Sequence, residues 1–223
     1  MRQKNNETKE GIMNRWYDVL ANKLRRFAIP SLMKYLVICM GAVFLMDLFF
    51  MGQFRSYLWF SRPAIYSGQI WRLISFIFIP ISASPLFIVF VLYFYYMIGE
   101  ALEREWGVAK FNLFYLIGIL GTIIAGLITG FATNHYLNMS LFFAFAILFP
   151  EVQIRLFFVL PVKVKWLGYL NAAYFAYLLI SSGWPQRLAL LVSVANIILF
   201  FQNDVRRQIG NTRKRREWKN YFR

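Results

Sequence analysis

Few side chains in the apolar segments of this sequence could perform nucleophilic or acid–base chemistry. Ser140 is the hydroxyl that we consider as a nucleophile, and His135 is the only histidine among the 223 residues. A serine hydroxyl is a poor nucleophile without a positioned base. Residues five apart on a helix lie on different faces, so we expect His135 to occupy a short turn and not to serve Ser140. We expect the Ser140 hydroxyl to bond back to a carbonyl of its own helix.

The sequence shows no pattern that is typical of a metal or cofactor site. The chain has one cysteine, Cys39, and one histidine, which excludes a thiolate cluster or a disulfide framework. No zinc motif, P-loop, dinucleotide fingerprint or haem motif is present in the sequence. We therefore expect no metal site and no cofactor.

The composition indicates a protein that folds in lipid. Hydrophobic residues make up 59% of the chain and charged residues only 16%, whereas soluble domains average about 45–50% apolar and about 25% charged residues. The apolar residues form long blocks, and a helix crosses the hydrocarbon core in about 20 residues. We expect an all-α polytopic membrane protein with six spans: residues 31–51, 85–102, 111–132, 135–149, 166–182 and 186–202. The fourth span is short, and about 15 residues cross only a thinned bilayer.

Basic residues predict the orientation and the domain organisation. All but four of the 25 Lys and Arg fall at the ends of the chain or in alternate connections, and such residues mark the cytoplasmic side. We expect a basic cytoplasmic segment (1–30), the transmembrane domain (31–202) and a basic cytoplasmic tail (203–223). The net charge of +15 is then explained by topology and by contact with anionic lipid, and we expect no nucleic-acid partner.

The connection between the first two spans, residues 52–84, is much longer than the others. Long connections without secondary structure of their own are uncommon in compact domains. This one is rich in aromatic residues, isoleucine and proline. We expect one or two short amphipathic elements that lie in the outer membrane interface.

Several short motifs occur in a defined order along the chain. Trp71 and Arg72 lie in the long outer connection, and Gly99, Glu103 and Gly107 mark the end of the second span. The third span carries four small residues at helix-packing positions, Gly118, Gly121, Gly126 and Gly130. In this order the features resemble the rhomboid superfamily, which includes intramembrane serine proteases and inactive, Derlin-like members. The segment 150–166 resembles that family's cytoplasmic turn before the fifth span.

The resemblance implies roles for some of these residues, and each has a simpler alternative. Trp71 and Arg72 would brace the outer loop, or they would be generic interfacial anchors. Glu103 would bind the end of a neighbouring helix, or it would be a solvated residue at the inner boundary. Three asparagines at membrane depth are expected to join helices by hydrogen bonds: Asn138, Asn171 and Asn196.

The catalytic residues of the family are incomplete here. In its proteases a Gly-x-Ser-Gly serine of the fourth span pairs with a histidine of the sixth. Ser140 has the nucleophile's place, but Asn138 and Leu141 replace both glycines, and residues 188–203 contain no His, Lys, Asp or Glu. Loss of the base removes most catalysis. We expect no catalytic residue and an inactive, Derlin-like member.

The expected function is the binding of transmembrane client proteins without cleavage, in a locally thinned bilayer. Two alternatives remain open at this stage. One is an intramembrane serine protease that uses Ser140 with an atypical base, and the other is a small transporter or channel. The expected location is a plasma membrane, bacterial by residue usage, with anionic lipids at the cytoplasmic face.

Overall fold

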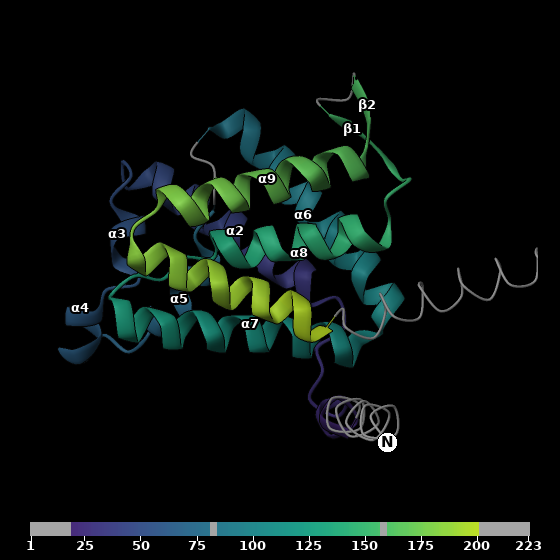
Figure 1. Ribbon diagram of the computed structural model, residues 1–223. Coiled ribbons are helices and arrows are strands. Elements are labelled where there is room, and N and C mark those ends of the chain that lie inside the picture. The colour runs from purple at the N-terminus through teal and green to yellow at the C-terminus, as the bar shows by residue number, and fades with distance from the viewer. Residues whose placement is uncertain (1–18, 81–83, 157–159, 201–223) are drawn as a thin grey trace, which may run out of the picture.

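The computed structural model describes residues 19–80, 84–156 and 160–200 (Figure 1). Most of the predicted N-terminal segment and the whole predicted tail lie outside the described residues. The chain is mainly helical, as the sequence predicts. Its long helices are α2 (Leu32–Phe49), α6 (Pro85–Trp106), α7 (Val108–Thr129), α8 (His135–Leu148), α9 (Val164–Ser181) and a last helix, Trp184–Phe200. Each predicted span overlaps one of these helices.

The long connection after α2 folds into short helices. These are α3 (Phe54–Leu58), α4 (Arg62–Tyr66), α5 (Arg72–Ser75) and the 3-10 helix η1 (Phe76–Phe78). Figure 1 shows α3 and α4 at one end of the long helices. The predicted short elements are therefore present, and there are more of them than we expected.

A small hairpin lies at the opposite end of the long helices (Figure 1). Strand β1 (Gln153–Leu156) pairs antiparallel with β2 (Leu160–Lys163), with Ile154 opposite Val162. The sequence predicted only a turn here. The strands are short, and one strand contains a proline, so neither strand gives a recognisable alternating pattern.

Local sequence explains where the helices begin and end. Pro85 opens α6, since a proline at the first helical position loses no intrahelical hydrogen bond. Gly107 has φ +83° and separates α6 from α7, and Gly130 has φ +81° and ends α7. Both values lie in the left-handed region, which glycine adopts without steric cost.

Apolar side chains cover the outside of the helices, and polar side chains occur in the interior. Ile128 and Ile180 are 62% and 77% exposed, whereas Asn138 and Ser140 are fully buried. Soluble monomers rarely expose large contiguous apolar areas. This distribution of exposed apolar and buried polar side chains is typical of a protein whose surface faces an apolar medium.

Two helices, α2 and α7, are long and apolar enough to cross a membrane. Helix α8 and the helix Trp184–Phe200 are apolar but shorter. By length and composition, the described part of the chain therefore holds at least two candidate spans.

Candidate functional site

Ser140 bonds back to its own helix, as the sequence predicts. Its side chain is fully buried in α8, and its hydroxyl donates a hydrogen bond of 2.7 Å to the carbonyl of Leu137. The His135 ring packs edge-on against the adjacent Tyr136, with ring centroids 5.5 Å apart. The structure thus pairs the hydroxyl with a backbone acceptor of its own helix, and no base contacts it among the described residues.

Two of the three asparagines that the sequence analysis selected for helix joining do contact neighbouring helices. Asn171 of α9 donates to the carbonyl of Met139 in α8 at 3.3 Å, and Asn196 of the last helix donates to that of Phe114 in α7 at 3.2 Å. These contacts confirm the prediction for both residues. Asn138 differs, because neither polar atom of its buried amide has a hydrogen-bond partner within the described ranges.

Arg72 lies at the centre of the folded connection between α2 and α6, which we call the outer connection after its predicted location. Its Nη1 donates to the carbonyls of Ser56 at 2.7 Å and Trp59 at 2.8 Å, and its Nε donates to Gln69 Oε1 at 2.6 Å. These two carbonyls lie at the end of α3, where helical carbonyls lack intrahelical partners. A cation at a helix C-terminus is also electrostatically favourable.

The residues beside Arg72 complete this contact. Trp71 Nε1 donates to the carbonyl of Tyr57 at 3.2 Å, and the Ser75 hydroxyl donates to that of Leu58 at 2.8 Å. Four consecutive carbonyls, 56–59, therefore each accept a side-chain hydrogen bond from one short segment. We call Trp71, Arg72 and Ser75 the loop brace. Of the two interpretations that the sequence left open for Trp71 and Arg72, the contacts match the bracing one.

Further polar contacts fasten the same connection to the long helices. Asp47 of α2 forms an ion pair of 3.0 Å with Arg55 Nε and also accepts the Arg55 backbone N–H. Asn134, before α8, donates to the carbonyls of residues 77 and 79 at 2.8 Å each. Arg62 donates to two carbonyls at the end of α7, at 3.2 and 3.4 Å. We did not assign these roles from sequence, although isolated polar residues at the ends of apolar segments were a usable signal.

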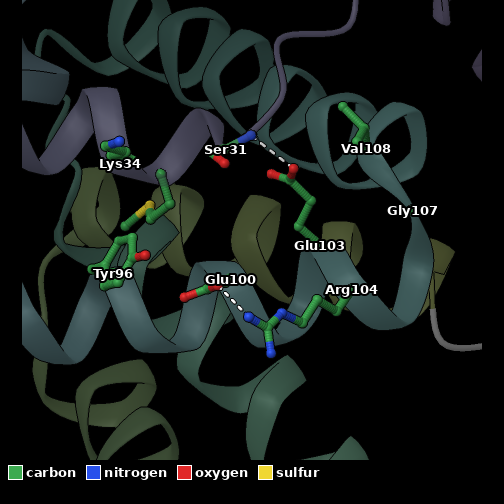
Figure 2. A pocket seen from close by; sticks show the side chains of 9 residues that line it. Ser31, Lys34, Tyr96, Glu100, Glu103, Arg104, Gly107 and Val108 are labelled. Carbon is green, nitrogen blue, oxygen red and sulfur yellow. Dashed lines mark hydrogen bonds and ion pairs between the residues drawn. The ribbon is translucent and has the colours of Figure 1, made fainter.

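Glu103 lies beside the start of α2. Its Oε1 accepts the backbone N–H of Ser31 at 2.7 Å (Figure 2). Asn112 of α7 binds the residue two positions earlier, with its amide oxygen and nitrogen each 3.0 Å from the backbone N and O of Ile29. The chain entering α2 is thus held by both α6 and α7. The Glu103 contact matches the helix-end alternative, and Asn112 was missed because one asparagine near a helix start carries no specific pattern.

Several glycines leave no room for a side chain where helices meet. A Cβ on Gly99 of α6 would overlap Met33 of α2, and one on Gly118 of α7 would overlap Leu137 of α8. A Cβ on Gly121 would lie 2.6 Å from a valine of the last helix. Glycine therefore permits close approach at three helix contacts.

The two later glycines of α7 have different roles. A Cβ on Gly126 would lie 2.7 Å from Phe60 of the outer connection, so this glycine packs against a loop. A Cβ on Gly130 would meet no atom within 4 Å, and this glycine ends α7 with φ +81°. The predicted helix-packing role is wrong for Gly130, because α7 ends at this residue and no neighbouring helix approaches its Cβ position.

One cluster of charges lies at the base of the hairpin and the start of α9. Glu151 accepts from Lys165 and Lys163, both at 2.9 Å. Hydrogen bonds from Lys165 and then from Lys163 hold the pKa of the Glu151 carboxyl below its usual value of 4.5. This exposed cluster connects the two ends of the hairpin.

No known family model matches this chain, and no curated protein sequence matches it.

Proposed function

We propose that this chain is a rhomboid-like, non-proteolytic membrane protein that binds transmembrane segments of client proteins. The proposed bundle has six spans: α2, α6, α7, α8, α9 and the helix Trp184–Phe200. The polarity of the helices supports it, since large apolar side chains such as Ile128 and Ile180 are exposed whereas the asparagines Asn138, Asn171 and Asn196 are buried. By the positive-inside rule, the hairpin end and both termini are cytoplasmic.

The hydrogen bond from Ser140 to the carbonyl of Leu137 is the observation that carries the non-proteolytic part. A nucleophile must be free to attack and must lose its proton to a base. Here the hydroxyl is buried and its proton is directed at a carbonyl, which is not a base at neutral pH. Asn196 of the last helix supports the same view, because its amide donates a hydrogen bond to a backbone carbonyl.

A fluorophosphonate probe tests this part directly. Such probes label activated serines, so the purified protein is expected to remain unlabelled. A catalytically active serine hydrolase treated in parallel is the control for the probe. Labelling of the wild-type protein that is lost in Ser140→Ala would establish the hydrolase alternative and overturn the proposal.

The shape of the bundle supports client binding beside α8. This helix has 14 residues, which span about 21 Å against a hydrocarbon core of about 30 Å. A short span favours local thinning of the bilayer. Adjacent residues of α8 contact two of its neighbours: Phe142 packs on Phe94 of α6 with centroids 5.6 Å apart, and Phe143 packs on Phe175 of α9 at 6.4 Å. A client helix that lies between α6 and α9 would therefore meet the short helix.

The folded outer connection supports a shallow position in the membrane interface. Four of its aromatic side chains are exposed: Tyr57, Trp59, Tyr66 and Trp71. Four of its backbone carbonyls accept hydrogen bonds from the loop brace. Exposed aromatic residues with an amphipathic character prefer the interface. A stable outer element of this kind would limit access to the bundle from one leaflet.

Photocrosslinking in intact membranes tests client binding. A benzoylphenylalanine at Phe87 of α6 or Tyr174 of α9 is expected to capture membrane proteins, and one at Ile124 of α7 serves as the control position. All three side chains are exposed. Capture is expected to survive Ser140→Ala and to fall when Trp71 and Arg72 are both changed, while the exposed Trp184→Ala serves as the matched control. Equal capture at all three positions would contradict client binding. Equal capture by the Trp71 and Arg72 variant and by the Trp184→Ala control would contradict it as well.

A further inference from the structure

A cavity of about 270 Å³ lies where the start of α2 meets the end of α6 and the start of α7 (Figure 2). In the proposed topology this place is the cytoplasmic boundary of the membrane. Ligand pockets typically enclose about 300–1,000 Å³. The cavity is therefore of a size for a lipid headgroup and not for a whole lipid.

The charges that line the cavity are balanced. Lys34 and Arg104 contribute two cations, and Glu100 and Glu103 contribute two carboxylates. A purely anionic ligand would meet two carboxylates, and a purely cationic one would meet two cations, so both are disfavoured. A small ligand that carries one charge of each sign would find partners for both.

Existing contacts determine which of these groups remain available. Glu103 uses Oε1 to hold the N–H of Ser31, and Glu100 forms an ion pair with Arg104 (Figure 2). Lys34 makes no ion pair within the described part of the chain. The Tyr96 hydroxyl also forms a hydrogen bond with the Glu100 carboxylate. A carboxylate offers about four lone-pair sites, so Glu100 can accept a further donor while it keeps both Arg104 and Tyr96.

Exposed apolar side chains extend from the cavity along both bordering helices. On α2, Ile38 and Leu45 follow Lys34 at helical spacing, and each is 57% exposed. On α6, Tyr93 and Val89 precede the cavity residue Glu100 at helical spacing, and they are 58% and 69% exposed. Residues three, four, seven or eleven positions apart share one helix face. An apolar surface therefore leads away from the charged cavity on each helix.

We propose that this cavity binds the phosphoethanolamine headgroup of a membrane lipid. Its phosphate faces Lys34, its ammonium group faces Glu100, and its acyl chains lie along the apolar faces of α2 and α6. The inference rests on the membrane placement proposed above. It adds a specific lipid site, which client binding does not require.

The headgroup chemistry predicts a definite order of preference. Phosphatidylcholine has the same charges, but its quaternary ammonium cannot donate a hydrogen bond to a carboxylate. Phosphatidylglycerol lacks the ammonium group that would bind to Glu100. Phosphatidylethanolamine is therefore expected to bind more tightly than either.

Spin-labelled lipids measure this preference in bilayers that contain the purified full chain. The motionally restricted fraction of each labelled lipid gives its relative association constant. We expect phosphatidylethanolamine to exceed phosphatidylcholine by roughly two- to fivefold, the range for one solvent-accessible hydrogen bond. Equal association of the two, or a preference for phosphatidylglycerol, would overturn the inference.

Paired substitutions assign the preference to this cavity. Glu100→Gln is expected to reduce the ratio to about one, because Glu100 accepts the hydrogen bond that only the primary ammonium donates. Lys34→Gln is expected to weaken the association of both lipids and to leave their ratio unchanged, because both lipids carry the phosphate that Lys34 binds. Lys23→Gln and Glu105→Gln, which change exposed residues outside the cavity, are expected to retain both the association and the ratio. Circular dichroism and size exclusion establish that each variant is folded, and Lys34→Gln carries the test if Glu100→Gln does not fold. An unchanged association of both lipids with folded Lys34→Gln, or an unchanged ratio in folded Glu100→Gln, contradicts the inference.

Two further outcomes separate this inference from the proposals on which it rests. Water-soluble glycerophosphoethanolamine is expected not to displace the labelled lipid, because it lacks the acyl chains. Displacement by it would assign the cavity to a soluble ligand and overturn the lipid site. A chain that restricts no labelled lipid at all would instead contradict the membrane bundle itself, whereas equal restriction of all lipids contradicts only the specific site.

Discussion

The Glu103 carboxylate accepts the backbone N–H of Ser31 at 2.7 Å, which ties the end of α6 to the start of α2. Ser31 has φ +53° and makes no side-chain capping bond of its own to α2. The first N–H groups of a helix need partners from outside the helix. A carboxylate 72 positions further along the chain supplies one of them, so the beginning of α2 depends on the end of α6.

Glu103→Ala is expected to destabilise this junction. The substitution removes a charge-assisted acceptor from a partly exposed N–H, which lowers the free energy of unfolding by about 1 kcal/mol. Thermal unfolding in detergent measures the change. Glu105→Ala, at an exposed position of the same helix, is the matched control, and an equal effect of the two substitutions would show that the Ser31 contact contributes nothing.

Arg72→Lys is expected to loosen the outer connection although it keeps the charge. The guanidinium bonds three acceptors from two nitrogens in a fixed geometry, and an ammonium cannot reproduce that planar fork. We expect a loss of about 1–2 kcal/mol, as for a partly satisfied buried network. Limited proteolysis of residues 54–78 reports the loosening.

Arg62→Lys provides the control for this experiment. Arg62 also lies in the outer connection, but a single nitrogen makes its two longer contacts with α7. A lysine can replace a single donor group, so the cleavage rate is expected to change little. If both lysine variants are cleaved at the wild-type rate, the loop brace does not determine the stability of the connection.

Glycine-to-alanine substitutions distinguish glycines that allow close packing from glycines that provide a left-handed backbone conformation. Gly118→Ala would drive a methyl group into Leu137 and is expected to cost about 1–3 kcal/mol, as overpacking does. Gly130→Ala has open space but requires a left-handed backbone, with an expected cost of about 1 kcal/mol. Gly41→Ala would bring a methyl group to 3.5 Å from Leu92, an ordinary contact, and is expected to be neutral. Thermal unfolding of the three variants should follow this order.

The sequence predicted the helices well because long apolar blocks are a strong signal, and α2 and α8 begin and end within two residues of the expected bounds. It predicted less well the contacts that fold residues 52–84, because these depend on residues distant in sequence. Arg72 binds carbonyls 13 and 16 positions earlier, and Asn134 binds carbonyls more than 50 positions earlier. Backbone carbonyls have no residue-type signature, so only the fold identifies which ones require a donor.

The Glu151 cluster predicts a dependence of stability on pH. Lys165 and Lys163 lower the pKa of the Glu151 carboxyl below 4.5, so the unfolded state binds its proton more readily than the folded state. The stabilisation is therefore present above pH of about 4.5 and is lost as pH falls through the lower pKa of the folded state. Wild-type and Glu151→Gln proteins are expected to differ in thermal stability at pH 7 and to converge near pH 3. A constant difference across this range would exclude the ion pairs as its cause.

Asn138 and Asn196 are both buried in the bundle, but they predict opposite responses to leucine. Asn196→Leu removes the hydrogen bond to the carbonyl of Phe114 and is expected to destabilise the protein by about 1–2 kcal/mol. Asn138→Leu replaces an amide with no partner in the described residues, and removing an unsatisfied buried polar group is expected to be neutral or stabilising. Unfolding of the two variants in the same detergent measures the contrast. A large loss for Asn138→Leu would mean that this amide binds something beyond the described chain, such as a trapped water molecule or a polar group of a client helix.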